Sequence, residues 1–123
     1  MGFGSPENLC ETSRGQLMST GRKFDNGKLE YGLLPPFALE ETVKVLTFGA
    51  QKYERDNWKK VPDSKRRYFD ALQRHLWQWK RGEQLDQESG INHLAHAMCC
   101  LMFLLDRDLF TDEEWKNYIN PSA

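Results

Sequence analysis

Two histidines at the start of an apolar segment carry side chains that can bind a metal ion or contact a phosphate. His93 and His96 lie three residues apart, and Asp86 and Glu88 precede them. A spacing of three places two side chains on one side of a helix. Imidazole and carboxylate groups from neighbouring segments can together hold a divalent ion or line a phosphate pocket. The alternative is packing, because a single histidine on a half-buried helix more often only makes hydrogen bonds.

Basic and aromatic side chains elsewhere are of the kinds that contact nucleotides. A basic loop precedes a helix that begins with proline, and the positive end of that helix dipole suits a phosphate. Tryptophan rings can stack on a base. The alternatives are solvated loop charges and tryptophans that only pack. The residues are Arg22, Lys23 and Lys28 around the turn 25–27, and Trp58, Trp77 and Trp79.

Two carboxylates on the first expected helix are further candidates. Glu40 and Glu41 lie beside its apolar stripe, and Glu40 is four residues from Lys44. An exposed ion pair of that spacing contributes only a few tenths of a kcal/mol. A carboxylate that points into the bundle instead needs a cation as partner, either lysine or Mg²⁺.

The elements that position these groups are expected to be helices. Apolar residues recur at helical spacing in three segments, which predicts helices over about 36–55, over 64–80, and from about 89 through 104. The third segment is apolar nearly all round, which indicates a central helix. No segment alternates apolar and polar residues over the length of a strand. The fold class is therefore all-α, a small bundle of three to four helices completed by oligomerisation.

Local signals mark the ends of these helices. Ser64 is the expected N-cap of the second helix, and Gly82 ends it by turning left-handed. Ser89 or Asp86 is expected to cap the third. Residues 111–114 spell a capping box, in which Thr111 and Glu114 each satisfy the other's backbone, before a short helix that ends at Asn120-Pro121.

Composition limits the class of protein. We expect one domain over residues 22–123 after a flexible leader over 1–21. A formal charge of −1 gives no overall basic field for nucleic acid. The three cysteines form no spaced framework and indicate reduced thiols. Without a membrane-spanning run or signal peptide, the protein is expected in the cytoplasm, as a homo-oligomer (a dimer or tetramer) because its apolar helix needs covering.

Taken in order, several short motifs resemble the bacteriophage family of dATP/dGTP diphosphohydrolase N-terminal domains, which is likened to the MazG-type all-α nucleotide pyrophosphohydrolases. The similarity covers about residues 22–106. The motifs are Asp25-x-Gly27-Lys28, Leu34-Pro35, Phe48-Gly-Ala-x-Lys52-Tyr53, Asn57-Trp58, Arg74-His75, Arg81-Gly-Glu83, Asp86-x-Glu88-Ser-Gly90 and His93-x-x-His96.

The resemblance implies hydrolysis of purine deoxynucleoside triphosphates between the α and β phosphates, with Mg²⁺ or Mn²⁺ as cofactor and, if the chain is phage-encoded, in the host cytoplasm. The catalytic and metal-binding candidates are Glu41, Glu88, His93 and His96. The substrate-binding candidates are Lys23, Lys28, Lys52, Tyr53, Trp58, Arg74 and His75.

The sequence departs from the MazG-type pattern at the metal ligands. Those enzymes use Glu-x-x-Glu and Glu-x-x-Asp on successive helices, where this chain has Glu41-x-x-Lys44 and His93-x-x-His96. Three hypotheses follow: a purine dNTP pyrophosphohydrolase with a different metal site, a catalytically idle binder that sequesters a nucleotide or signalling nucleotide, and a helical protein-interaction module.

Overall fold

The computed structural model describes residues 20–121 of the 123-residue chain, which divides into two units, 1–31 and 32–123. In the first unit, residues 20–31 are exposed, and the backbone N–H of Lys28 donates to the carbonyl of Asp25 (3.0 Å). The expected leader lies outside the described residues except for positions 20 and 21. The 3₁₀ helix η1, Tyr31–Leu33, spans the boundary between the units.

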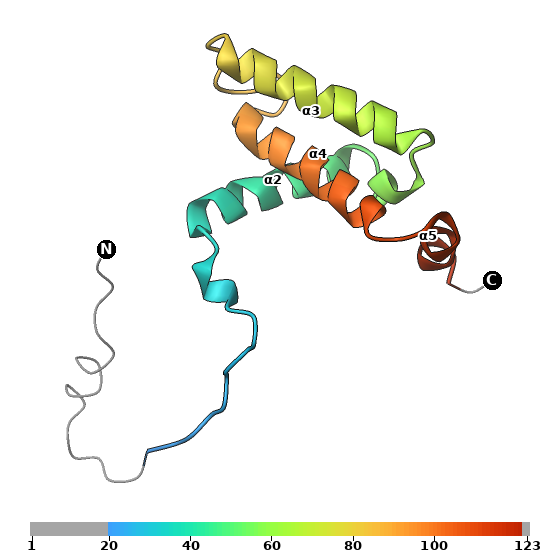
Figure 1. Cartoon of the computed structure of the whole chain (residues 1–123). Coiled ribbons are helices and arrows are strands. Elements are labelled where there is room, and N and C mark those ends of the chain that lie inside the picture. The colour runs from blue at the N-terminus through green and yellow to red at the C-terminus, as the bar shows by residue number, and fades with distance from the viewer. Residues whose placement is uncertain (1–19, 122–123) are drawn as a thin grey trace. The chain divides into compact units, whose positions relative to one another are not determined.

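The second unit is all-α, as predicted. Within residues 32–121 it has four α-helices and no strand (Figure 1); they are α2 (Pro36–Lys52), α3 (Ser64–Lys80), α4 (His93–Asp108) and α5 (Asp112–Ile119). A short 3₁₀ helix, η2 (Asn57–Lys60), connects α2 with α3. None of the helices among the described residues has the length and apolar composition needed to cross a bilayer.

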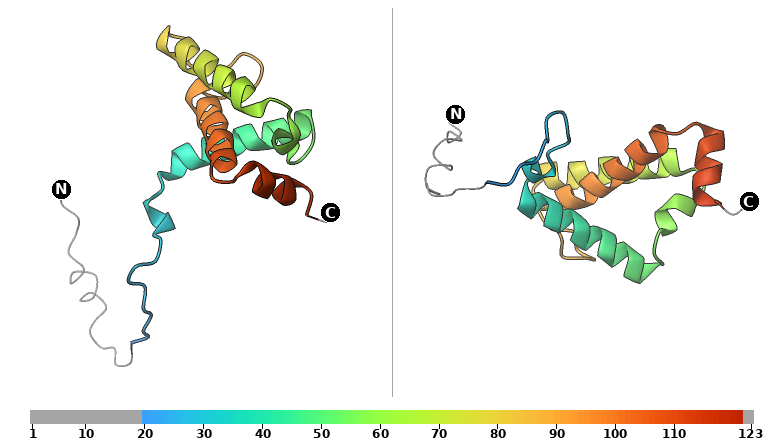
Figure 2. Two further views of the ribbon diagram at one scale, coloured as in Figure 1. Left: turned by 45° about the vertical axis from the view of Figure 1, so that its right-hand side comes forward. Right: turned by 90° about the horizontal axis from the view of Figure 1, so that it is seen from below.

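Helix α4 holds the second unit together, because it packs against both α2 and α3 (Figure 2). Val45 of α2 meets Ala95 and Cys99 of α4 in the core, where Phe103 also packs. The Cys99 thiol donates a hydrogen bond to the backbone carbonyl of Thr42 (3.4 Å). The apolar character of α4 therefore correctly predicted a central helix.

Two of the expected helix caps are wrong. Helix α3 includes Ser64, and Asp63 precedes it in a left-handed conformation, with φ of 55° and no side-chain cap. Helix α4 begins at His93 because the Asn92 side chain accepts from the backbone N–H of Leu94 (2.8 Å). Neither Ser89 nor Asp86 caps α4, since the two side chains are bonded to each other in the preceding loop.

The other helix ends agree with the local signals except for that of α2. The backbone leaves helical geometry at Tyr53, so α2 ends at Lys52 and not near residue 55. Gly82 follows α3 with φ of 109°, a conformation that suits glycine. The capping box of α5 is present, with Thr111 Oγ1 3.1 Å from the Glu114 backbone nitrogen and Glu114 Oε1 2.9 Å from that of Thr111.

Within residues 20–121, one face of α4 is left largely uncovered. Leu94, Met98, Leu101 and Leu105, at steps of four, three and four, are 40–57% exposed. No Lys, Arg, Asp or Glu occurs between His93 and Leu105. A stripe of this kind normally faces another apolar surface.

Candidate functional site

A cavity of about 680 Å³ lies among α2, α3 and α4 and is large enough for a nucleotide. Its floor is partly apolar, with Val45, Cys99 and Phe103. Its polar wall contains Lys52, Arg74, His75, Asp86, Glu88 and His96. Side chains from three helices and from both connections between them therefore meet around a single cavity.

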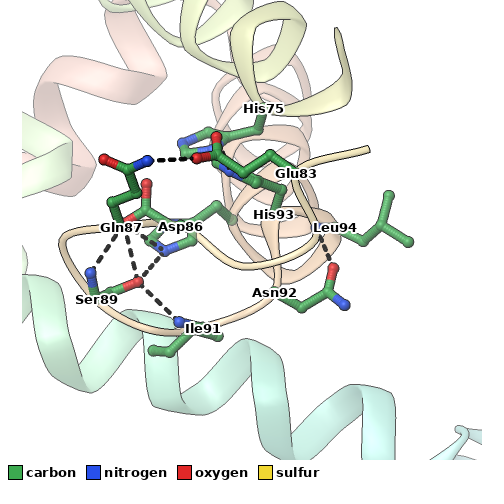
Figure 3. Close-up of polar contacts among 10 residues, drawn as sticks. His75, Glu83, Asp86, Gln87, Ser89, Ile91, Asn92, His93 and Leu94 are labelled. Atoms are coloured by element: carbon green, nitrogen blue, oxygen red, sulfur yellow. Dashed lines mark hydrogen bonds and ion pairs between the residues drawn. The ribbon is translucent and has the colours of Figure 1, made fainter. Parts of the chain in front are cut away.

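The loop between α3 and α4 brings the carboxylates to this cavity. It folds back on itself: the backbone N–H of Asp86 donates to the carbonyl of Ile91 (2.9 Å), and that of His93 donates to the carbonyl of Gln84 (2.9 Å). Gly90 has φ of 73°, in the left-handed region that favours glycine. The turn places Asp86 beside the histidines of both helices (Figure 3).

Asp86, Ser89 and His96 form a satisfied hydrogen-bond group. The Ser89 backbone N–H (2.9 Å) and hydroxyl (3.1 Å) both donate to Asp86 Oδ2. Because the hydroxyl hydrogen is used there, Nε2–H of His96 donates to Ser89 Oγ (2.7 Å). Partial burial raises the pKa of Asp86, but the two bonds from Ser89 and the nearby histidines outweigh it, so the net pKa is lowered.

His75 of α3 lies over the α4 histidines. Its ring stacks on that of His96, with centroids 4.6 Å apart and planes at 13°. Its Nδ1 lies 2.8 Å from Nδ1 of His93. Burial first, and then the neighbouring rings of His96 and His93, lower the pKa of His75 to about 4, so this imidazole is neutral at physiological pH. Burial also lowers the pKa of His96.

His93 is the most enclosed member, at 1% exposure. Its Nε2 lies 3.1 Å from Glu83 Oε1. A carboxylate only accepts, so Nε2 of His93 carries the hydrogen. The other Glu83 oxygen accepts from the side-chain amide of Gln87 (2.9 Å). Figure 3 shows His75, Glu83, Asp86 and His93 gathered where α3, the loop and α4 meet.

The structure brings all three histidines together. The two glutamates predicted to bind metal with His93 and His96 lie in different places. Glu88 lines the cavity and forms an ion pair with Lys52 (2.8 Å). Glu41 pairs with Lys44 on the same helix (2.8 Å) and is not among the residues that line the cavity. The pair raises the pKa of Lys44, first through its hydrogen bond to Glu41.

Five of the seven predicted substrate-binding residues line the cavity. They are Lys52, Tyr53, Trp58, Arg74 and His75. Trp58 also packs on Phe103, with ring centroids 4.5 Å apart. Lys23 and Lys28 belong to the first unit, where Lys23 lies 3.9 Å from Asp25.

Sequence reasoning named Asp86 only as a carboxylate upstream of the histidines, and it did not include Glu83 or Ser89 among the site residues. Asp86 and Ser89 carried a usable signal, because an aspartate three residues before a serine often closes a turn through its side chain. Glu83 appeared only in the motif Arg81-Gly-Glu83; ten residues separate it from His93, and only the folded loop brings the two together.

Comparisons with known proteins give a family and one curated relative. Residues 18–117 match the family described as dATP/dGTP diphosphohydrolase, N-terminal. A dATP/dGTP diphosphohydrolase of Salmonella phage PMBT28 is 38% identical over 100 residues, which are 78% of this chain and 34% of the relative. The chain thus spans about a third of that relative's length. No solved structure matches the chain.

Proposed function

This chain belongs to the dATP/dGTP diphosphohydrolase N-terminal family, and from that premise we propose that it hydrolyses dATP and dGTP to the monophosphate and pyrophosphate in the host cytoplasm, with a divalent cation. The observation that carries the proposal is the cavity among α2, α3 and α4, which combines room for a nucleotide with cationic, carboxylate and imidazole groups. The relative's name supports the substrate class.

The charges around the cavity suit a triphosphate. Lys52 and Arg74 offer positive charge to the phosphates, and a triphosphate can displace Glu88 from its 2.8 Å pair with Lys52. The released Glu88 carboxylate can then take the proton from a water that attacks the α-phosphorus. The bond from the α-phosphorus to the bridging oxygen breaks, and pyrophosphate leaves.

A divalent cation would neutralise the phosphates and lower the pKa of the attacking water. The imidazoles and carboxylates of the cavity are groups that bind such ions. Glu41 is held by Lys44 outside the lining residues, so the proposed reaction uses Glu88 in its place.

Pyrophosphate release from each of the four dNTPs, with Mg²⁺ or Mn²⁺, tests the proposal. We expect turnover of dATP and dGTP, a fall in kcat of about 100-fold for Glu88→Gln as expected for loss of a general base, and a raised KM for Lys52→Gln. Glu113→Gln, an exposed change on α5, is the matched control. Binding without turnover would favour the idle nucleotide binder, and absence of binding would favour the helical interaction module.

The proposal includes self-association through the exposed stripe of α4, Leu94, Met98, Leu101 and Leu105. The partner is a second copy, related by a two-fold axis so that the same stripe lies on both sides. An antiparallel pairing centred on Leu101 also sets exposed Asp108 beside the positive N-terminal end of the partner helix. None of the four stripe residues lines the cavity, so this pairing leaves the cavity open.

A further inference from the structure

Three side chains beside the cavity have the chemistry and spacing of a metal site. One ring nitrogen each of His75 and His93 and one oxygen of Asp86 all lie within 4.8 Å of one another. Ligand atoms that share one zinc-like ion, at about 2.0–2.2 Å from it, lie about 3–4 Å apart. The side chains therefore need only small rotations to close on an ion.

The hydrogen-bond pattern leaves the necessary lone pairs free. Nε2–H of His93 donates to Glu83, so Nδ1 of the neutral ring carries a lone pair. That lone pair points at Nδ1 of His75, 2.8 Å away, where only one hydrogen can lie between the two rings. An ion that binds here replaces this hydrogen, which moves to Nε2 of His75 without a net change in protonation.

Asp86 is held in place and still has coordination capacity. Both hydrogen bonds from Ser89 go to Oδ2, and among the described residues no hydrogen bond reaches Oδ1. Two imidazoles and a carboxylate form an N,N,O set that leaves positions open for water or phosphate oxygen.

Glu83 supplies the outer contact that orients a metal-bound histidine. A ligating imidazole usually donates its other N–H to a carboxylate, which fixes the tautomer and the ring. Glu83 accepts this bond from His93 and is itself held by Gln87 (2.9 Å). The buried position of His93 prevents the ring from turning away.

We propose that His75, His93 and Asp86 bind a first-row transition-metal ion such as Mn²⁺, Co²⁺ or Zn²⁺, and that Glu83 is the positioning residue for His93. Imidazole ligands favour these ions over Mg²⁺, which prefers oxygen. Only the ion's role in hydrolysis rests on the proposed function; its binding does not. Of the group predicted from sequence, this site shares His93.

Metal binding to the full chain without nucleotide tests the site. After treatment with EDTA and dialysis, calorimetric titration with Mn²⁺ and with Zn²⁺ should give one ion per chain. His75→Gln and Asp86→Asn should weaken binding at least 30-fold, and Glu83→Gln should weaken it about 10- to 100-fold. ¹⁵N NMR of the imidazoles should show the His75 hydrogen moving from Nδ1 to Nε2 on addition of Zn²⁺.

Matched changes separate this site from the group predicted from sequence. Glu41→Gln and Glu88→Gln should keep the affinity for both ions, as should the exposed change Asp70→Asn on α3. Because His75 is only half-buried, a thermal melt of His75→Gln is expected to show a folded chain. No binding, or unchanged binding by folded His75→Gln, would overturn the site. Pyrophosphate release with Mg²⁺ in that case would leave the proposed function standing.

Discussion

The two faces of α4 depart from the rule that large apolar side chains are usually buried, because the exposed face carries large apolar side chains. The fully buried residues of the covered face, among them His93, Ala95 and Cys99, are small or polar, and the larger Phe103 is only partly buried there. The other face carries Met98 and Leu101, which remain substantially exposed. Small side chains favour close packing of α2 and α3 on α4, whereas the large ones are not covered by the described residues.

The covered face also changes character along its length. Near the N-terminal end it carries His93 and His96, each bonded to a loop residue. One or two turns later it carries Cys99 and Cys100, whose pKa values burial raises to about 12 and about 11. The same face therefore carries hydrogen-bonded imidazoles near the start of α4 and inert thiols further along it, and His96, Cys99 and Cys100 all line the cavity.

The largest expected difference between the faces is in stability. Cys99→Asp places a charge where the side chain is 2% exposed and should lower the free energy of unfolding by about 3–5 kcal/mol, as an uncompensated buried charge does. Leu101→Asp on the other face should lower it by less than about 1 kcal/mol in dilute protein. Urea unfolding measures the free energy of unfolding of both variants. Equal losses in the two variants would contradict the difference between the faces.

The next largest effect concerns self-association. Leu101→Asp lies at the centre of the exposed stripe and should weaken a two-fold pair by about 30-fold, corresponding to about 2 kcal/mol at a central contact. Sedimentation equilibrium gives the dissociation constant. Phe69→Asp, an exposed apolar position on α3 outside the stripe, is the control that should leave association unchanged. A wild-type chain that stays single at high concentration would contradict the proposed pairing.

The smallest effect is a pH dependence at the polar end of the covered face, where His75 of α3 stacks on His96. The folded-state pKa values of His75 and His96 are lowered, so the unfolded chain binds more protons in acid. The contribution of these two histidines to the free energy of unfolding should be fully present above the ordinary histidine pKa of about 6.5. It should fall as the pH drops towards about 4, the pKa of His75 in the folded chain. Thermal melts in EDTA measure the slope, which His75→Gln should flatten; an equal slope in that variant would contradict the assignment.

Much of the local structure could be predicted because it depends on neighbouring residues. Thr111 and Glu114 are three residues apart, so their capping box needs no tertiary contact. The start of α4 was harder to predict: several residues before the helix can cap it, and Asn92 does so because Asp86 and Ser89 already bond to each other. The local signals predicted a helix here, but they did not show which of several competing side chains would cap its N-terminus.

The sequence by itself determined that this is an all-α chain of its family, with an apolar α4 and a histidine pair three residues apart, because helical periodicity and short motifs are properties of adjacent residues. Only the tertiary structure decided that His75 and Glu83 join His93, that Glu41 does not line the cavity, and which face of α4 remains exposed. These outcomes depend on how helices cross and how a loop folds back, and no spacing along the chain encodes them.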